Sequence, residues 1–233
     1  MGQAGDIAVL GAGIGGLAIA TLLAGEGRRV LVFDRFEAPR AVGSGLMIQP
    51  TGRAVLERMG LWENLAPLCA PIDRLIGRNE QDRRVLDVRF AALGTGRQGF
   101  GTLRGTLFET LLEAAREAGA TLLPQSDIEG ADAERGTLRL NGGREAGPFA
   151  LIVDALGLRS PLTKAPRREL PYGALWATLP WPADGDFDPA ALEQRYRAAS
   201  RMAGVMASGR PSPGAPKTAT YFWSIKAAQA KDW

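Results

Sequence analysis

The chain has 233 residues, of which 45% are hydrophobic and 23% charged, a composition typical of soluble globular proteins. Its 28 lysines and arginines outnumber 25 acidic residues by only three and are dispersed, so we expect no nucleic-acid partner. No apolar run approaches the ~20 residues that cross a bilayer, and the first residues lack the regions of a signal peptide. We therefore expect a cytoplasmic protein without stable membrane insertion.

Histidine is absent, and Cys69 is the single cysteine. This composition excludes an intrachain disulfide, a cysteine-cluster metal site and every catalytic arrangement that depends on histidine. Chemistry must then come from carboxylates, the backbone or a bound cofactor. We predict no metal ligand, and we expect Cys69 to be a small buried residue that fills space in the core.

The first 35 residues predict a dinucleotide-binding βαβ unit. An apolar strand over residues 6–10 leads into the glycine-rich turn Gly11–Gly16, which opens a helix over residues 14–26. A second apolar strand over residues 30–34 ends in an acid, Asp34. Strand, turn, helix, strand and acid occur in the order that this unit requires, which disfavours the alternative of a tight turn without a ligand.

Each residue type in this unit has a physical reason. Gly11 permits the sharp turn, Gly13 lets a pyrophosphate approach the backbone, and Gly16 lets the helix pack closely on the sheet. The N–H groups at the helix start near Ile14 and Gly15 would face the phosphates. Asp34 follows Gly16 at close to the ~20-residue spacing expected of an acid that binds a ribose hydroxyl.

Further elements are predicted from turn and capping signals. Residues 35–49, which include Pro39, read as a loop, and residues 91–101 as a mobile glycine-rich loop. Leu151–Asp154 suits a buried parallel strand. Thr51 can cap a helix that runs to about Met59. The other expected elements are a hairpin over 74–90, a helix from the capping box Thr106–Glu109 to Ala118, a strand over 121–123, a hairpin turning at Asn141–Gly143, and strands over 174–179, 195–208 and 219–225.

These elements predict an α/β fold in two parts. Residues 1–165 would form a Rossmann-like domain with a hairpin insertion around 72–100. After a proline-marked linker, residues 171–233 would begin a sheet-based second domain. Aromatic residues in this sheet either line a pocket or belong to the core, and strand aromatics are more often core. They are Trp176, Trp181, Tyr221, Phe222 and Trp223.

The sequence resembles the single-component FAD monooxygenases that are similar to para-hydroxybenzoate hydroxylase. Four segments spread along the chain carry the resemblance. They are the glycine turn with Phe33-Asp-Arg35, the stretch Val42–Pro50 with the helix after it, Leu103-Arg104 before a helix, and Leu151-Ile-Val-Asp-Ala-Leu-Gly-Leu-Arg-Ser160.

The resemblance implies a cofactor, FAD, and roles for named residues. Gly11, Gly13 and Gly16 would hold its pyrophosphate, Asp34 its ribose, and Arg35 would lie at the adenine end. Arg104 would reach FAD from the helix start, where a guanidinium can donate two hydrogen bonds to phosphate or ribose oxygen atoms. The alternative is that Arg104 is a solvated surface arginine. The remaining implied cofactor-site residues are Gly45, Asp154 and Gly157.

The chain departs from the family pattern at two places. Where the family carries Asp before Gly157, this chain has Leu156, and Asp154 either substitutes for it or faces solvent at the strand end. The family's later Gly-Asp motif, which contacts the ribityl region of FAD, has no counterpart, and family members are longer. We therefore expect the chain to be the N-terminal portion of such an enzyme.

The implied reaction uses O₂ and NAD(P)H to hydroxylate an aromatic or similar small substrate. NAD(P)H would reduce FAD, and a hydroperoxide at the flavin C4a carbon would transfer one oxygen atom. Because the flavin would supply the reactive atom, we name no catalytic side chain in this chain. Two alternatives stay open: a related FAD-dependent oxidoreductase or halogenase, and a non-catalytic FAD-binding fragment. The sequence does not identify the substrate, the choice between NADH and NADPH, or the oligomeric state.

Overall fold

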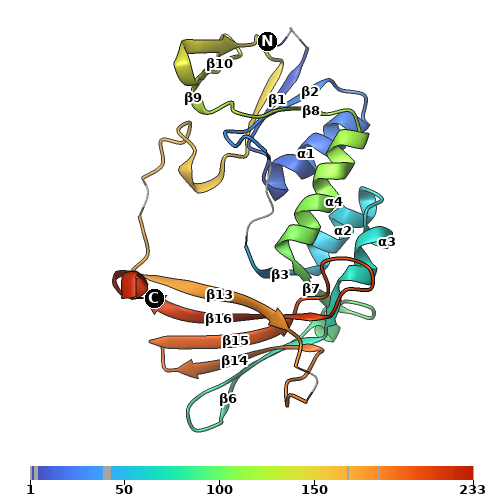
Figure 1. Ribbon diagram of the computed structural model, residues 1–233, viewed down its shortest axis with the longest axis vertical. Helices are drawn as coiled ribbons and strands as arrows, with labels where there is room; N and C mark the ends of the chain where they lie inside the picture. Colours follow the sequence, from blue (N-terminus) through green and yellow to red (C-terminus); the bar gives the residue numbers. More distant parts are fainter. Residues whose placement is uncertain (1, 3–4, 39–42, 167, 183, 233) are drawn as a thin grey trace. The chain divides into compact units, whose positions relative to one another are not determined.

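The computed structural model describes residues 2, 5–38, 43–166, 168–182 and 184–232 (Figure 1). Two compact units are present, one built from residues 1–41 and 107–167 and the other from residues 42–106 and 168–233. The division is therefore not the contiguous one predicted from the sequence. Residues 72–100 group with the C-terminal strands because β5 (Arg74–Arg78) pairs in parallel with β14 (Ala191–Arg197). Pro39 and Val42, named in the sequence analysis, lie outside the described residues.

The first unit contains the predicted βαβ unit. Four parallel strands lie in the order β12-β1-β2-β8. Leu151 on β12 is 47% exposed, so this strand is a partly exposed edge and not the buried strand that its apolar sequence predicts. The strands are β1 (Ile7–Leu10), β2 (Val30–Phe33), β8 (Thr121–Leu123) and β12 (Leu151–Asp154).

Helix α1 (Ile14–Gly25) packs on β1 and β2 through its buried face, which includes Leu17 and Ala20. Gly27, with φ of +78°, follows its end in the left-handed conformation that favours glycine. Helix α4 (Arg104–Glu117) begins two residues before the predicted capping box, so Thr106 lies inside its first turn.

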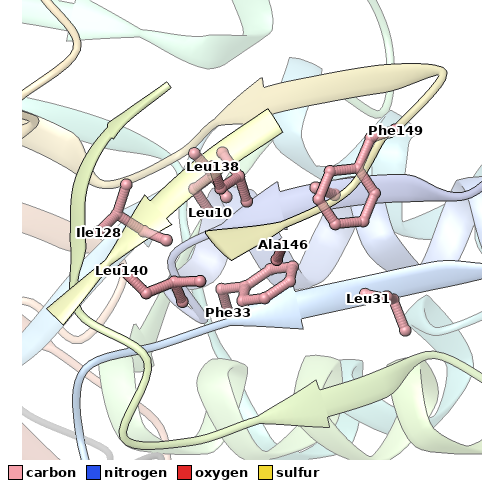
Figure 2. Close-up of a cluster of buried hydrophobic side chains, with 9 residues drawn as sticks. Leu10, Leu31, Phe33, Ile128, Leu138, Leu140, Ala146 and Phe149 are labelled. Atoms are coloured by element: carbon pink, nitrogen blue, oxygen red, sulfur yellow. The ribbon is translucent and has the colours of Figure 1, made fainter. Parts of the chain in front are cut away.

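A three-stranded antiparallel sheet covers the other face of β1 and β2 in the first unit. Its strands are β9 (Ile128–Asp132), β10 (Thr137–Leu140) and β11 (Arg144–Ala146), with the predicted turn over Asn141–Gly143. Figure 2 shows the core between the two sheets, in which the rings of Phe33 and Phe149 meet edge to face at 5.8 Å.

The second unit is built on a six-stranded sheet in the order β13-β16-β15-β14-β5-β6 (Figure 1). Only the β14–β5 pair among these described strands is parallel. The predicted strand over 195–208 is two strands, because the chain reverses at Ala198. The strands are β5 (Arg74–Arg78), β6 (Arg84–Arg89), β13 (Tyr172–Pro180), β14 (Ala191–Arg197), β15 (Arg201–Ala207) and β16 (Thr218–Lys226).

A smaller antiparallel sheet, β3-β7-β4, completes the second unit. Its strands are β3 (Gly45–Ile48), β4 (Ala70–Ile72) and β7 (Gly99–Leu103). The predicted loop over 35–49 therefore contains a strand, and a second strand begins within the predicted loop over 91–101. Between β3 and β4 lie the short helices α2 (Pro50–Arg58) and α3 (Trp62–Leu65). Thr51 is the second residue of α2 and not its cap. None of the helices in the described part of the chain has the length and apolar character needed to cross a membrane.

Candidate functional site

The glycine turn between β1 and α1 leaves an open surface above two of its glycines. Gly11 has φ of +100°, and a Cβ there would lie 2.7 Å from the Ala155 carbonyl oxygen. A Cβ on Gly16 would overlap the Gly11 carbonyl oxygen, so this glycine allows the helix to approach the strand. Gly13 and Gly15 are exposed, and a Cβ on either would meet nothing within 4 Å. A ligand can therefore reach the backbone at these two positions.

The start of α1 has the chemistry of an anion site. No side chain caps the helix, which begins at Ile14, and its first turn carries no acidic residue. The N–H groups and the positive end of the helix dipole therefore favour a negatively charged ligand beside Gly13 and Gly15. This combination fits a dinucleotide pyrophosphate.

Asp34 lies at the edge of the same turn. One of its carboxylate oxygens accepts a hydrogen bond from the Ala12 N–H at 2.7 Å, and the other accepts one from the Phe36 N–H at 3.0 Å. A carboxylate has further lone pairs that ribose hydroxyls could use. Arg35 is exposed, and its guanidinium carbon lies 4.9 Å from the centre of the Phe36 ring. The structure therefore brings Asp34, but not Arg35, into hydrogen-bond contact with the glycine turn.

Asp154 organises the loop after β12. Its carboxylate accepts hydrogen bonds from the Leu156 N–H at 3.1 Å and from the Ser160 hydroxyl at 2.5 Å. Leu156 packs against the core of the first unit, and Gly157 has φ of +73°. Leu156, which occupies the position of the family's aspartate, therefore contributes to the packing of the core. Asp154 holds the loop that contains Gly157 through its two hydrogen bonds.

Gly45 and Arg104 form a second group of predicted site residues, within the second unit. The Arg104 backbone N–H donates to the Ser44 carbonyl oxygen at 3.0 Å, and a Cβ on Gly43 would lie 3.0 Å from the Arg104 Cδ. These residues border a cavity of about 510 Å³. Its walls are completed by apolar and aromatic side chains of the strands β3, β13, β14, β15 and β16, among them Met47, Trp176, Leu192, Met206 and Phe222.

Two further residues of this cavity region were not predicted. Thr220 lines the cavity and Ser208 lies beside it, and both are almost fully buried. Ser208 directly follows β15 and Thr220 lies within β16, and the sequence alone gives neither hydroxyl a functional signal. The consecutive aromatic residues Tyr221, Phe222 and Trp223 all line a separate cavity of about 640 Å³ on the same sheet. Trp176 and Phe222 border both cavities.

Cys69 is half-buried, and its thiol donates a hydrogen bond to the Leu65 carbonyl oxygen at 3.4 Å. Burial raises the pKa of the Cys69 thiol, and a hydrogen bond with Thr102 lowers it to a smaller extent. The thiol is therefore kept neutral, which suits a packing role. Within the described residues, no cluster of three or more acidic or cysteine side chains could hold a metal ion.

Comparisons with known proteins identify the same cofactor chemistry. A family model described as an FAD binding domain matches residues 5–145. The chain is 28% identical over 163 residues to a putative 2-heptyl-3-hydroxy-4(1H)-quinolone synthase, AqdB1, from Rhodococcus erythropolis, a match that covers 68% of this chain and 41% of the relative. It is 32% identical over 163 residues to the FAD-dependent monooxygenase atnJ from Arthrinium sp, which covers 67% of this chain and 37% of that protein.

Solved structures share the fold. A variant of 2-methyl-3-hydroxypyridine-5-carboxylic acid oxygenase matches 97% of this chain and 60% of its own with a TM-score of 0.81 and 20% identity. PqsL from Pseudomonas aeruginosa, in complex with 2-aminobenzoylacetate, matches 99% of this chain and 63% of its own with a TM-score of 0.80 and 21% identity. The chain thus spans less than half the length of the two sequence relatives and about three fifths of these structures.

Proposed function

Since the chain belongs to a family of flavoproteins that have an FAD binding domain and resemble the single-component aromatic hydroxylases, we propose that it works in an FAD-dependent monooxygenase. The proposed reaction consumes O₂ and NAD(P)H and hydroxylates an aromatic or similar small organic substrate. The observation that carries the proposal is the uncapped start of α1, open above Gly13 and Gly15 and bordered by Asp34.

The first unit would hold the ADP half of FAD. The backbone at Gly13 and Gly15 binds the pyrophosphate, since no side chain stands in the way there. Asp34 accepts hydrogen bonds from the adenosine ribose, while its contact with the Ala12 N–H fixes the carboxylate against the turn. Gly11 and Gly16 have a structural role, because Gly11 permits the close approach of the backbone at Ala155 and Gly16 that of the backbone at Gly11.

Within the second unit, we assign the cavity beside Gly45 and Arg104 to the reaction. Arg104 supplies a permanent positive charge for FAD oxygen atoms. The apolar side chains of Met47, Leu192, Met206 and Phe222 suit a flat organic ring and exclude water around it. FAD, when bound and reduced, supplies the oxygen-activating chemistry, so no side chain of this chain is required as a nucleophile or base.

The proposal places the protein in the cytoplasm, where reduced nicotinamide nucleotides are available. Its partners are O₂ and a small aromatic substrate. We propose neither a nucleic-acid partner nor a membrane-inserted state.

The test has two stages with the purified chain. FAD is first titrated into the apoprotein and flavin fluorescence is followed; we expect saturable binding in the micromolar range. NAD(P)H oxidation and O₂ uptake are then measured with a panel of aromatic compounds, at least one of which should stimulate both. Failure to bind FAD would contradict the whole proposal. Binding of FAD without substrate-stimulated O₂ uptake would limit the chain to cofactor binding.

A further inference from the structure

Two buried hydroxyl groups tie β3 to the large sheet of the second unit. Thr220 on β16 is 2% exposed, and Ser208, immediately after β15, is fully buried. Their oxygens lie 2.6 Å apart, and the Thr220 oxygen also accepts a hydrogen bond of 2.9 Å from the Gly45 N–H. Gly45 is half-buried, and Thr220 supplies the acceptor for its N–H from another sheet.

Glycines make this close approach feasible. A Cβ on Gly45 would overlap the hydroxyl oxygens of both Thr220 and Ser208. On the neighbouring strand, a Cβ on Gly101 would overlap the Ala207 carbonyl oxygen. Both glycines therefore permit β3 and β7 to lie directly against β15 and β16.

The contact continues to Arg104 through the backbone. Ser44, the residue before Gly45, accepts the hydrogen bond from the Arg104 N–H, and Gly43 packs against the Arg104 side chain. A shift of Gly45 would move Ser44 and with it the start of α4. The position of Arg104 beside the cavity is thus linked to Thr220 by two consecutive hydrogen bonds.

We propose that Thr220, supported by Ser208, is a positioning residue that fixes the Gly43–Gly45 segment and Arg104 for FAD. This inference rests on the proposed function, because it requires the segment to contact the cofactor. Thr220 acts through Gly45 and is not itself a catalytic residue.

Three variants separate positioning from packing. Thr220→Val keeps the shape of the side chain but removes the acceptor of the Gly45 N–H. Ser208 keeps a second acceptor in this variant, the Met206 carbonyl oxygen at 3.3 Å. Thr220→Ser restores the hydroxyl. Thr178→Val is the matched control, since Thr178 is exposed and lies opposite Thr220 on β13.

The first readout is amide hydrogen exchange of Gly45 in the protein without FAD. We expect Thr220→Val to speed exchange about tenfold, and Thr220→Ser and Thr178→Val to leave it near the wild-type rate. Unchanged exchange in Thr220→Val would overturn the positioning contact, whether or not the protein binds FAD.

The second readout is the Kd for FAD. We expect Thr220→Val to raise it about tenfold and Thr220→Ser to restore it to within about twofold of wild type. Faster exchange with an unchanged Kd would show a merely structural contact and would overturn the proposal. A wild-type protein that binds no FAD would instead contradict the proposed function.

Discussion

The carboxylate of Asp34 accepts a hydrogen bond of 2.7 Å from the backbone N–H of Ala12, which joins the end of β2 to the glycine turn after β1. This bond holds an acid beside an uncapped helix start. The Asp34 carboxylate lies where a ribose would be bound, and the backbone N–H groups at the start of α1 lie where the phosphates would be bound. The two halves of the candidate ADP site are therefore connected before any ligand arrives.

Asp34→Asn should weaken FAD binding. The amide is a poorer acceptor than the carboxylate, both for the Ala12 N–H and for ribose hydroxyls, so we expect the Kd for FAD to rise about tenfold. Fluorescence titration measures the change. Glu26→Gln is the control, because Glu26 is an exposed carboxylate at the opposite end of α1. An equal effect of both variants would indicate a general loss of charge and not a loss of this contact.

Gly45→Ala should destabilise the second unit. The added methyl group would overlap the Thr220 and Ser208 oxygens, and overpacking of this kind costs about 1–3 kcal/mol. Gly173→Ala on β13 provides the comparison, since a Cβ there meets nothing within 4 Å. Urea unfolding should show a lower midpoint for Gly45→Ala alone. Equal midpoints for the two variants would contradict the close approach of β3 to β15 and β16.

Ser160→Ala should loosen the loop after β12. The substitution removes the Ser160 hydroxyl from the Asp154 carboxylate and from the Leu162 N–H at 3.1 Å. Because Ser160 is almost fully buried and its partner is charged, we expect a loss of about 1–3 kcal/mol in the free energy of unfolding. Ser160→Thr, which retains a hydroxyl, should recover part of that loss in the same chemical denaturation experiment. If Ser160→Ala unfolds like wild type, Asp154 does not organise this loop.

Cys69 should react slowly with alkylating reagents near pH 8. Burial keeps its pKa above the ordinary value, so less thiolate is present in the folded chain than in the unfolded chain. The raised pKa also makes stability depend on pH. The neutral thiol makes its full contribution to the free energy of unfolding below the pKa of the unfolded chain, and this contribution is lost as pH rises through the pKa of the folded chain. Alkylation rates measured against pH, with and without urea, test this. A folded protein that reacts at lower pH than the unfolded chain would contradict it.

The sequence predicted the βαβ unit because its signals are local. Glycine at fixed offsets, apolar strands and a terminal acid each follow from neighbours in the chain. The strands β3 and β7 were missed for the opposite reason. Both lie in glycine-containing segments, and contacts with distant strands, such as Gly45 with Thr220, stabilise them. Short strands of this kind carry little intrinsic β-propensity.

The hairpin of β14 and β15 was missed because its turn has no glycine, asparagine or aspartate. Ala198 takes the turn with φ of +45°, and the Ser200 N–H donates to the Arg197 carbonyl oxygen at 3.0 Å. The buried Ser208–Thr220 pair likewise has no motif, since it depends on which strands become neighbours. Family resemblance supplied Arg104 and Gly45 as candidate residues, and the structure supplied the contact that links them.

The most direct test of the FAD assignment is a comparison of Gly13→Ala with Gly25→Ala. A Cβ meets nothing within 4 Å at either position, so neither variant should disturb the fold, and both glycines belong to the turn and helix of α1. The methyl group at Gly13 would occupy the surface that we assign to the pyrophosphate, whereas the one at Gly25 lies at the far end of the helix. Fluorescence titration should give a Kd for FAD at least about tenfold higher for Gly13→Ala, and a wild-type Kd for Gly25→Ala. Identical FAD binding by the two variants would contradict the account.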